Sequence, residues 1–179
     1  MFDAGVAPYD ENVASTRAAV EWAHGHGLWL EAELGYVGGK PDAPISAHTP
    51  GTRTDPLEAA EFVKETGVDA LAVAVGSSHA MTTRTASLDH ALIRQLAVAV
   101  SVPLVLHGSS GVSDDDLASA VSAGIGKVNI GTALNIAYTH AIRQFLDSDG
   151  KVVDPRKYLS VARDAAAEVV AAALMVVSA

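Results

Sequence analysis

The sequence predicts an α/β protein with a parallel sheet, folded as one domain over residues 1–179. Four short apolar runs, each bounded by Gly, Pro or polar residues, have the length of strands. The second and third runs, 70–76 and 103–108, are continuously apolar, which is typical of parallel strands covered on both faces. Segments with helical start and stop signals separate the runs, and this alternation indicates βα units.

The expected strands follow one another along the chain with the same pattern. They cover residues 28–35, 70–76, 103–108 and 127–131. Each of them ends in Gly or polar residues before the next helix begins. Proteins of the α/β class place their chemistry at this carboxyl end of the strands.

The expected helices lie before, between and after these strands. They cover residues 11–27, 54–67, 87–100, 113–124, 132–148 and 158–174. In the second, Thr54 or Asp55 serves as N-cap and Pro56 stands near the first helical position, while Gly67 stops the helix. The third and fourth begin with Ser and acidic residues, which suit the helix dipole. The apolar tract at 165–179 is too short to span a bilayer, so we expect a buried terminal helix.

A closed barrel of eight βα units typically needs roughly 250 residues. This chain has 179 residues, with about four full units and a strand stub at residues 1–5. The sheet is therefore either an open one or the later part of a (β/α)₈ TIM barrel. The sequence period by itself leaves both readings open.

Charge and composition exclude several classes of partner. The net charge is −9, from 12 basic and 21 acidic residues, which argues against nucleic acid or an anionic membrane as the main ligand. Cysteine is absent, so no disulfide or thiolate metal site is expected. The first residues lack the features of a signal peptide. Together these features predict a cytoplasmic protein.

Two histidines lie at the ends of neighbouring expected strands. His107 closes the run 103–108, and His79 follows the run 70–76. Each alone could be a core histidine bonded to a carbonyl. Adjacent strand ends converge on one rim of a parallel barrel, so both imidazoles can face one point. Two His and one further N or O ligand, with one open position, form a catalytic zinc site.

Two glycine-containing loops and two carboxylates lie close to these histidines in the expected sheet. The loops at 108–111 and 129–132 each combine Gly with hydroxyl side chains before a helix, which suits a phosphate group. Glu31 and Glu33 lie on one face of their strand, where carboxylates are costly unless they are paired or metal-bound. An exposed or salt-bridged strand end is the alternative for either residue alone. Helix capping explains Asp89, next to His90, without a catalytic role.

With these residues assembled, the sequence resembles the class II fructose-bisphosphate/tagatose-bisphosphate aldolase family. The resemblance rests on the stretches MFDAG, DENVAST, LEAELGYVGG, TGVDALAVAVGSSHA, VPLVLHGSSGV, GIGKVNIGTALNIAYTHAIRQFL and DPRKYL. They follow the order and spacing of the family through nearly the whole chain. The family implies a zinc-dependent (β/α)₈ barrel that reversibly cleaves ketose 1,6-bisphosphates into dihydroxyacetone phosphate and glyceraldehyde 3-phosphate. It also implies a homo-oligomer.

The resemblance assigns roles to individual residues. His79 and His107 match two zinc-binding histidines, and Glu33 matches a carboxylate that binds zinc in some members. Asn129 would hydrogen-bond the substrate near the reacting carbons. The expected substrate-binding residues are Ala80, Gly108, Ser109, Ser110, Asn129, Ile130, Gly131 and Thr132. The segment at 35–52 matches a mobile active-site loop, and His48 within it is expected to be solvated.

Two departures from the family bear on function. Ala80 stands where the family usually has Gly. The family's catalytic Asp and first zinc His precede the MFDAG stretch, so the chain looks like the C-terminal part of a barrel, without about three strands. We therefore predict weak zinc binding and little turnover. One alternative is a non-catalytic sugar-phosphate-binding fragment, or a half-barrel that needs a partner chain. Another is a zinc hydrolase, against which the two phosphate loops argue.

Overall fold

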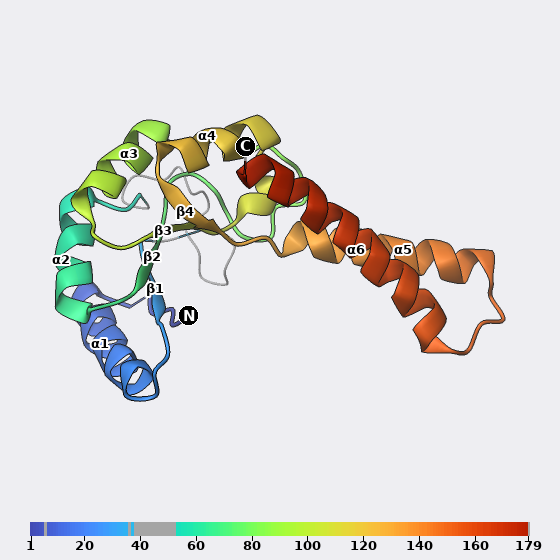
Figure 1. The fold of residues 1–179 in the computed structure, drawn as a ribbon, viewed down its shortest axis with the longest axis horizontal. Helices are drawn as coiled ribbons and strands as arrows, with labels where there is room; N and C mark the ends of the chain where they lie inside the picture. Colours follow the sequence, from blue (N-terminus) through green and yellow to red (C-terminus); the bar gives the residue numbers. More distant parts are fainter. Residues whose placement is uncertain (6, 36, 38–52, 179) are drawn as a thin grey trace.

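The computed structural model describes residues 1–5, 7–35, 37 and 53–178 (Figure 1). Its strands are β1 (Glu31–Leu34), β2 (Ala70–Val73), β3 (Leu104–Leu106) and β4 (Ile125–Val128). Its helices are α1 (Tyr9–Gly25), α2 (Pro56–Thr66), α3 (His90–Ala99), α4 (Asp114–Ala123), α5 (Thr132–Ser148) and α6 (Pro155–Val177), with a 3₁₀ turn at Ser109–Gly111. Helices and strands alternate from α1 to α5, as predicted. His48 and most of the segment 35–52 lie outside the described residues.

The four strands form one parallel sheet in the order β1-β2-β3-β4. Ala32, Leu71, Leu104 and Ile125 form one row of paired residues across the sheet. Phe2 adds an isolated parallel bridge to Ala32 on the outer side of β1, where the sequence predicts a strand stub. The carboxyl ends of all four strands therefore meet at one edge of the sheet.

The start of β4 and the start of α3 differ from the prediction. β4 begins at Ile125 rather than at residue 127, because Gly124, with φ of 128°, turns the chain directly from α4 into the strand. α3 begins after Asp89 rather than after Ser87, since the Asp89 carboxylate accepts a hydrogen bond from the backbone N–H of Leu92. The capping role expected for Asp89 is confirmed.

The start and end of α2 are as predicted. The Asp55 side chain accepts hydrogen bonds from the N–H groups of Leu57 and Glu58, and Pro56 follows as the first helical residue. Gly67 ends the helix in the left-handed conformation, with φ of 72°. This is the conformation in which glycine avoids the steric cost that other residues meet.

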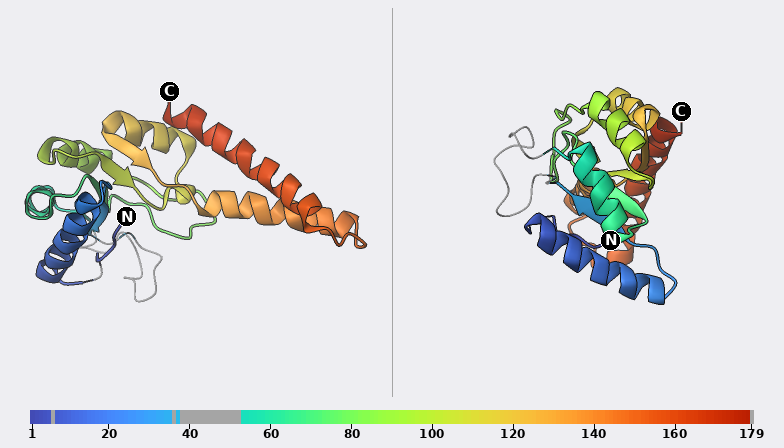
Figure 2. Two further views of the ribbon diagram at one scale, coloured as in Figure 1. Left: turned by 60° about the horizontal axis from the view of Figure 1, so that its bottom comes forward. Right: turned by 90° about the vertical axis from the view of Figure 1, so that its left-hand side faces the viewer.

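The apolar core lies between the sheet and the helices α1 to α4, which follow one another along one face of the sheet (Figures 1 and 2). The largest fully buried apolar side chains are Phe62, Leu71, Ile93, Leu96, Leu104 and Leu106. They come from α2, α3 and the two central strands, so this core fixes the position of the carboxyl ends of β2 and β3.

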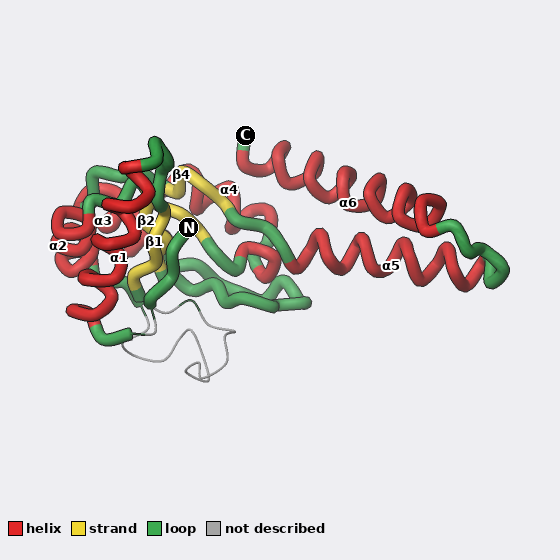
Figure 3. The backbone as a smooth tube through the Cα atoms, turned by 90° about the horizontal axis from the view of Figure 1, so that it is seen from below, coloured by secondary structure: helices red, strands yellow, loops and turns green. Residues whose placement is uncertain are grey.

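The expectation of a buried terminal helix is wrong. α6 packs along α5, and the two helices extend together away from the sheet (Figures 1 and 3). Ala162 is the only buried residue of α6 in the described part of the chain, while Leu174 and Met175 are exposed. The reason is that α6 contacts the rest of the fold mainly through α4 near its C-terminal end. Among the described residues, no helix has both the length and the apolar character needed to cross a bilayer.

Candidate metal centre and ligand cavity

Glu33, His79 and His107 come together at the carboxyl edge of the sheet. Glu33 lies in β1, His79 follows β2, and His107 directly follows β3. Each side chain offers one ligand atom, and these atoms lie within 4.8 Å of one another. The two imidazole ring centroids are 5.5 Å apart. The sequence-based expectation that the two imidazoles meet at one point therefore agrees with the structure.

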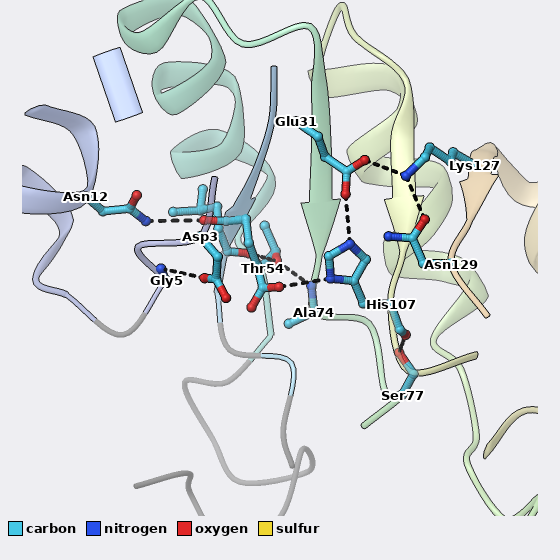
Figure 4. A network of polar contacts seen from close by, with 12 residues as sticks. Asp3, Gly5, Asn12, Glu31, Thr54, Ala74, Ser77, His107, Lys127 and Asn129 are labelled. Atoms are coloured by element: carbon cyan, nitrogen blue, oxygen red, sulfur yellow. Dashed lines mark hydrogen bonds and ion pairs between the residues drawn. The ribbon is translucent and has the colours of Figure 1, made fainter. Parts of the chain in front are cut away.

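Both ring nitrogens of His107 contact carboxylates of β1 (Figure 4). Nδ1 lies 3.0 Å from Oε2 of Glu33, and Nε2 lies 2.9 Å from Oε1 of Glu31. Glu31 and Glu33 thus share one face of β1, as the period of two predicts. The His107 side chain is 2% exposed and that of Glu33 is fully buried. Pairing of this kind offsets the cost of burying a carboxylate.

A lysine on β4 extends this network. Lys127 Nζ donates to Oε2 of Glu31 at 2.6 Å and to Oδ1 of Asn129 at 2.6 Å (Figure 4). The chain of contacts therefore runs from Asn129 through Lys127 and Glu31 to His107. Lys127 could not be predicted as a site residue, because nothing in the stretch KVNIG indicates a partner 96 positions earlier in the chain.

The hydrogen bonds among His107, Glu31, Glu33 and Lys127 shift the pKa values of His107 and Glu31 in opposite directions. Burial by itself lowers the pKa of His107, but the hydrogen bonds to Glu31 and Glu33 outweigh burial and raise it to about 9. Burial by itself raises the pKa of Glu31, but the hydrogen bonds from His107 and Lys127 lower it to about 2. Without a metal, these shifts favour the imidazolium form of His107 and the carboxylate form of Glu31.

Side chains from neighbouring elements hold the backbone of the site residues. The Asn12 amide donates to the carbonyl of Glu33 at 3.2 Å. Ser77 Oγ donates to the carbonyl of His107 at 2.5 Å, and Ser109 Oγ donates to the carbonyl of Asn129. These three carbonyls belong to the residues whose side chains face the cavity. These hydrogen bonds therefore fix the direction in which the side chains of Glu33, His107 and Asn129 project.

A cavity of about 460 Å³ opens beside the three clustered side chains. Its volume is in the range of small-molecule sites. It is lined by Met1, Asp3, Glu33, Ser78, His79, Ala80, His107, Gly108, Ser109, Ser110, Asn129, Ile130, Gly131 and Thr132. Every predicted metal or substrate residue is in this set. Among the described lining residues, Met1, Asp3 and Ser78 were not predicted, and none is Lys or Arg.

The N-terminus of α5 faces the cavity. Gly131 is the N-cap and makes no side-chain capping hydrogen bond, while Ser110 Oγ accepts from the N–H of Ala133 at 3.0 Å. A Cβ added at Gly131 would meet no atom of the described residues within 4 Å, so these residues leave the space beside this helix start open. Backbone N–H groups at a helix N-terminus attract anions.

Two backbone conformations shape the loop after β3 and the loop after β2. Gly108 has φ of 66°, and a Cβ there would lie 2.5 Å from the backbone carbonyl atoms of Ser78. Ala80 has φ of 59° and is the one described non-glycine residue with positive φ. The Gly that the resemblance leads one to expect at this position would avoid the cost of left-handed backbone, which is roughly 1–2 kcal/mol for other residues.

The other histidines lie elsewhere. His90 Nε2 contacts Oδ1 of Asp116 at 2.5 Å, at the start of α4. His24 contacts Asp69 at 3.0 Å at the opposite end of the sheet. Neither residue lines the cavity.

The family model of class II fructose-bisphosphate aldolases matches residues 1–179. The chain belongs to this family. A fructose-bisphosphate aldolase of Staphylococcus aureus (strain Mu50 / ATCC 700699) is 41% identical over 170 residues, which cover 95% of this chain and 59% of that relative. The chain thus spans about three fifths of the length of that relative.

Solved structures show the same partial match. The YdjI aldolase from Escherichia coli K12 superposes with a TM-score of 0.80 and 37% identity, over 97% of this chain and 58% of that one. A fructose-bisphosphate aldolase from Campylobacter jejuni superposes with a TM-score of 0.75 over 98% of this chain and 59% of that one. At 21% identity, this second match shows the fold alone. The predicted fold class, an incomplete α/β barrel of the class II aldolases, is confirmed.

The clustered side chains of Glu33, His79 and His107 offer donor atoms that suit a divalent metal. Imidazole nitrogen and carboxylate oxygen are both zinc ligands, with bonds of about 2.0–2.2 Å. Two ligand atoms on a tetrahedral zinc ion are therefore about 3.3 Å apart. The 3.0 Å between His107 Nδ1 and Glu33 Oε2 is close to that value. The donor set fits the metal that the resemblance implies.

Proposed function

We propose that this chain carries the zinc site and the dihydroxyacetone-phosphate site of a class II aldolase. The reaction is the reversible cleavage of a ketose 1,6-bisphosphate, fructose or tagatose, into dihydroxyacetone phosphate and glyceraldehyde 3-phosphate. One observation carries the proposal: the cluster of Glu33, His79 and His107 opens into the same cavity as the two glycine-containing loops.

The metal would be held by His79, His107 and Glu33. When bound, a zinc ion supplies Lewis-acid polarisation of the ketose carbonyl. The protein contributes the fixed direction of its ligands. Ser77 and Asn12 hold the backbone of His107 and Glu33, so these two ligands are in place before a metal arrives.

The phosphate group of the substrate would lie between residues 108–110 and residues 129–132. Because no described lining residue is Lys or Arg, backbone N–H groups at the start of α5 must provide much of the attraction. The hydroxyls of Ser110 and Thr132 add donors. Fixing the phosphate at one end orients the ketose carbons toward the metal ligands at the other, which is an orientation effect.

The proton of the substrate C4 hydroxyl needs a general base during cleavage. The resemblance assigns this role to an Asp that has no counterpart in residues 1–179. We therefore expect the 179-residue chain to bind dihydroxyacetone phosphate better than it cleaves a ketose bisphosphate. Asp3 lines the cavity, so it is the first residue to replace if turnover is found.

Calorimetry with dihydroxyacetone phosphate tests the proposal. The chain is titrated with dihydroxyacetone phosphate and, separately, with inorganic phosphate, each with and without zinc. We expect binding of dihydroxyacetone phosphate that is tighter with zinc, and weaker binding of inorganic phosphate that does not depend on zinc. A zinc-loaded chain that binds neither compound would refute the proposal.

A second candidate, binding without catalysis, shares this site. It is favoured by the absence of an assigned general base among the described cavity residues, and it predicts tight zinc-dependent binding with no cleavage of fructose bisphosphate. A zinc hydrolase is disfavoured, because the two phosphate loops would have no role in ester or amide hydrolysis. The C4 configuration of the substrate, the homo-oligomeric state and the cytoplasmic location stay predictions.

A further inference from the structure

Lys127 holds Asn129, which lines the ligand cavity, and Glu31, which contacts the buried His107 ring. Its ammonium group is 2.6 Å from a carboxylate oxygen of Glu31 and 2.6 Å from the amide oxygen of Asn129 (Figure 4). Lys127 itself does not line the ligand cavity. It therefore acts on any ligand only through Glu31 and Asn129.

The contact with Glu31 determines which nitrogen of His107 is available to a metal. Glu31 is an acceptor only, so Nε2 of His107, 2.9 Å away, must carry its proton toward Glu31. The other nitrogen, Nδ1, faces Glu33, which belongs to the metal-ligand cluster. A metal-binding histidine commonly donates its second ring N–H to a carboxylate, which fixes the tautomer and the ring orientation.

The contact with Asn129 determines the orientation of its amide. Lysine has only donors, so the Asn129 side chain must present its oxygen to Lys127. The NH₂ group is then on the other side of the amide. Asn129 lines the cavity, so its NH₂ group is the part available to a ligand oxygen.

We propose that Glu31 and Lys127 are positioning residues of the site. Glu31 holds the Nε2–H tautomer of His107, so that Nδ1 would be available to a metal, and Lys127 holds both Glu31 and the amide of Asn129. This inference rests on the metal site of the proposed function and adds two residues to it.

A purely structural role explains the network less well. The Lys127 side chain is 50% exposed, and exposed ion pairs contribute little to stability. Glu31, by contrast, is only 10% exposed and contacts the buried His107 ring. Loss of Lys127 should therefore change the site more than it changes the stability of the fold.

Zinc affinity tests the proposal, measured on the 179-residue chain by competition with a chromophoric chelator. Glu31→Gln keeps the shape of the side chain but makes it a poorer acceptor, and we expect about 10- to 100-fold weaker zinc binding. Lys127→Met should weaken zinc binding about 10-fold, and Lys127→Arg, which can still donate to both partners, should restore most of the loss. The matched controls Glu21→Gln and Lys151→Met, on exposed residues, should bind zinc as the unmodified chain does.

The tautomer of His107 can be measured directly, and a purely structural role of Glu31 would leave it unchanged. Nitrogen-15 NMR of the zinc-loaded chain should show a proton on Nε2 of His107 and none on Nδ1, and this pattern should be lost in Glu31→Gln. Circular dichroism of each variant checks that the fold is retained. A proton on Nδ1 of His107 in the zinc-loaded chain, or unchanged zinc affinity in Glu31→Gln, would overturn the inference.

The outcomes separate this inference from the proposed function. If the unmodified chain binds zinc and the Glu31 and Lys127 variants bind it equally well, only the positioning roles are refuted. If the variants lose zinc as expected but the zinc-loaded chain binds no dihydroxyacetone phosphate, the positioning roles stand and the proposed function fails. If the unmodified chain binds no zinc, both are refuted.

Discussion

At the residue scale, the glycines of the two phosphate loops, Gly108 and Gly131, differ in the space around their Cα atoms. Gly108 combines φ of 66° with a close approach to the backbone of Ser78, so a methyl group there would clash with atoms that cannot move independently. Gly131 has open space where a Cβ would lie. Gly108 is therefore needed by the fold, whereas Gly131 leaves room for a ligand.

We expect Gly108→Ala to lower the free energy of unfolding by at least about 2 kcal/mol, from left-handed strain plus the clash. Gly131→Ala should change it by less than about 0.5 kcal/mol but weaken binding of dihydroxyacetone phosphate. Urea unfolding of both variants, followed by calorimetry, measures both effects. Equal losses of stability would contradict this distinction between the two glycines.

Ala80 is strained in its left-handed conformation. Ala80→Gly should raise the free energy of unfolding by up to about 1 kcal/mol, because the relief of strain exceeds the added entropy of the unfolded chain. The matched control is Ala97→Gly within α3, where helical backbone should make the same change destabilising by about 1 kcal/mol. If Ala80→Gly is as destabilising as the control, Ala80 is not left-handed in solution.

At the scale of elements, Asp69 joins the start of β2 to the end of α1 and to the start of β1. Its carboxylate accepts from the backbone N–H of Leu30 at 2.7 Å and contacts His24 at 3.0 Å. Burial by itself raises the pKa of Asp69, but the hydrogen bonds from Leu30 and His24 outweigh burial and lower it from the ordinary value of 3.8. One side chain thus links three elements.

The lowered pKa of Asp69 makes stability depend on pH. The ionised carboxylate stabilises the fold above the unfolded-state pKa near 3.8, and this contribution is lost as the pH falls through the lower folded-state value. Asp69→Asn should therefore be less stable than the unmodified chain at pH 7, by about 1 kcal/mol, and the difference should shrink below about pH 4. Thermal unfolding from pH 3 to pH 7 measures this, with Asp147→Asn on α5 as the control. A difference between Asp69→Asn and the unmodified chain that does not change with pH would contradict the account.

The positions of most elements could be predicted from local signals. Apolar runs located the strands to within a few residues, and Asp55, Pro56 and Gly67 located α2, because caps act over one helical turn. Because parallel strands end at the same edge of a sheet, the sequence also predicted that His79 and His107 lie close together. Contacts that join distant parts of the chain, such as that of Lys127 with Glu31, have no local signal. The burial of α6 was predicted wrongly, because apolar composition does not determine which surface a helix packs against.

At the scale of the whole molecule, the sheet is covered unevenly. Helices α1 to α4 cover one face, while the α5–α6 pair projects away from it (Figure 1). A second cavity of about 330 Å³ lies between β4, α5 and α6, and Lys127 is the only charged residue among its described lining residues. Val170 and Leu174 line this cavity and are exposed. An apolar surface beside an edge strand favours association.

We therefore expect the 179-residue chain to self-associate at micromolar concentrations. Light scattering after size-exclusion chromatography measures the mass directly. Leu174→Glu should shift the population toward monomer, whereas Lys151→Glu, in the turn between α5 and α6, should not. A monodisperse monomer of the unmodified chain at high concentration would contradict this expectation.

The central claim is that Glu33, His79 and His107 bind one metal ion. X-ray absorption spectroscopy of the chain loaded with one equivalent of zinc tests it most directly. The account predicts two imidazole ligands and oxygen at about 2.0–2.2 Å, with one imidazole lost in His79→Ala and in His107→Ala. A spectrum without imidazole scattering, or one that neither substitution changes, would contradict the account.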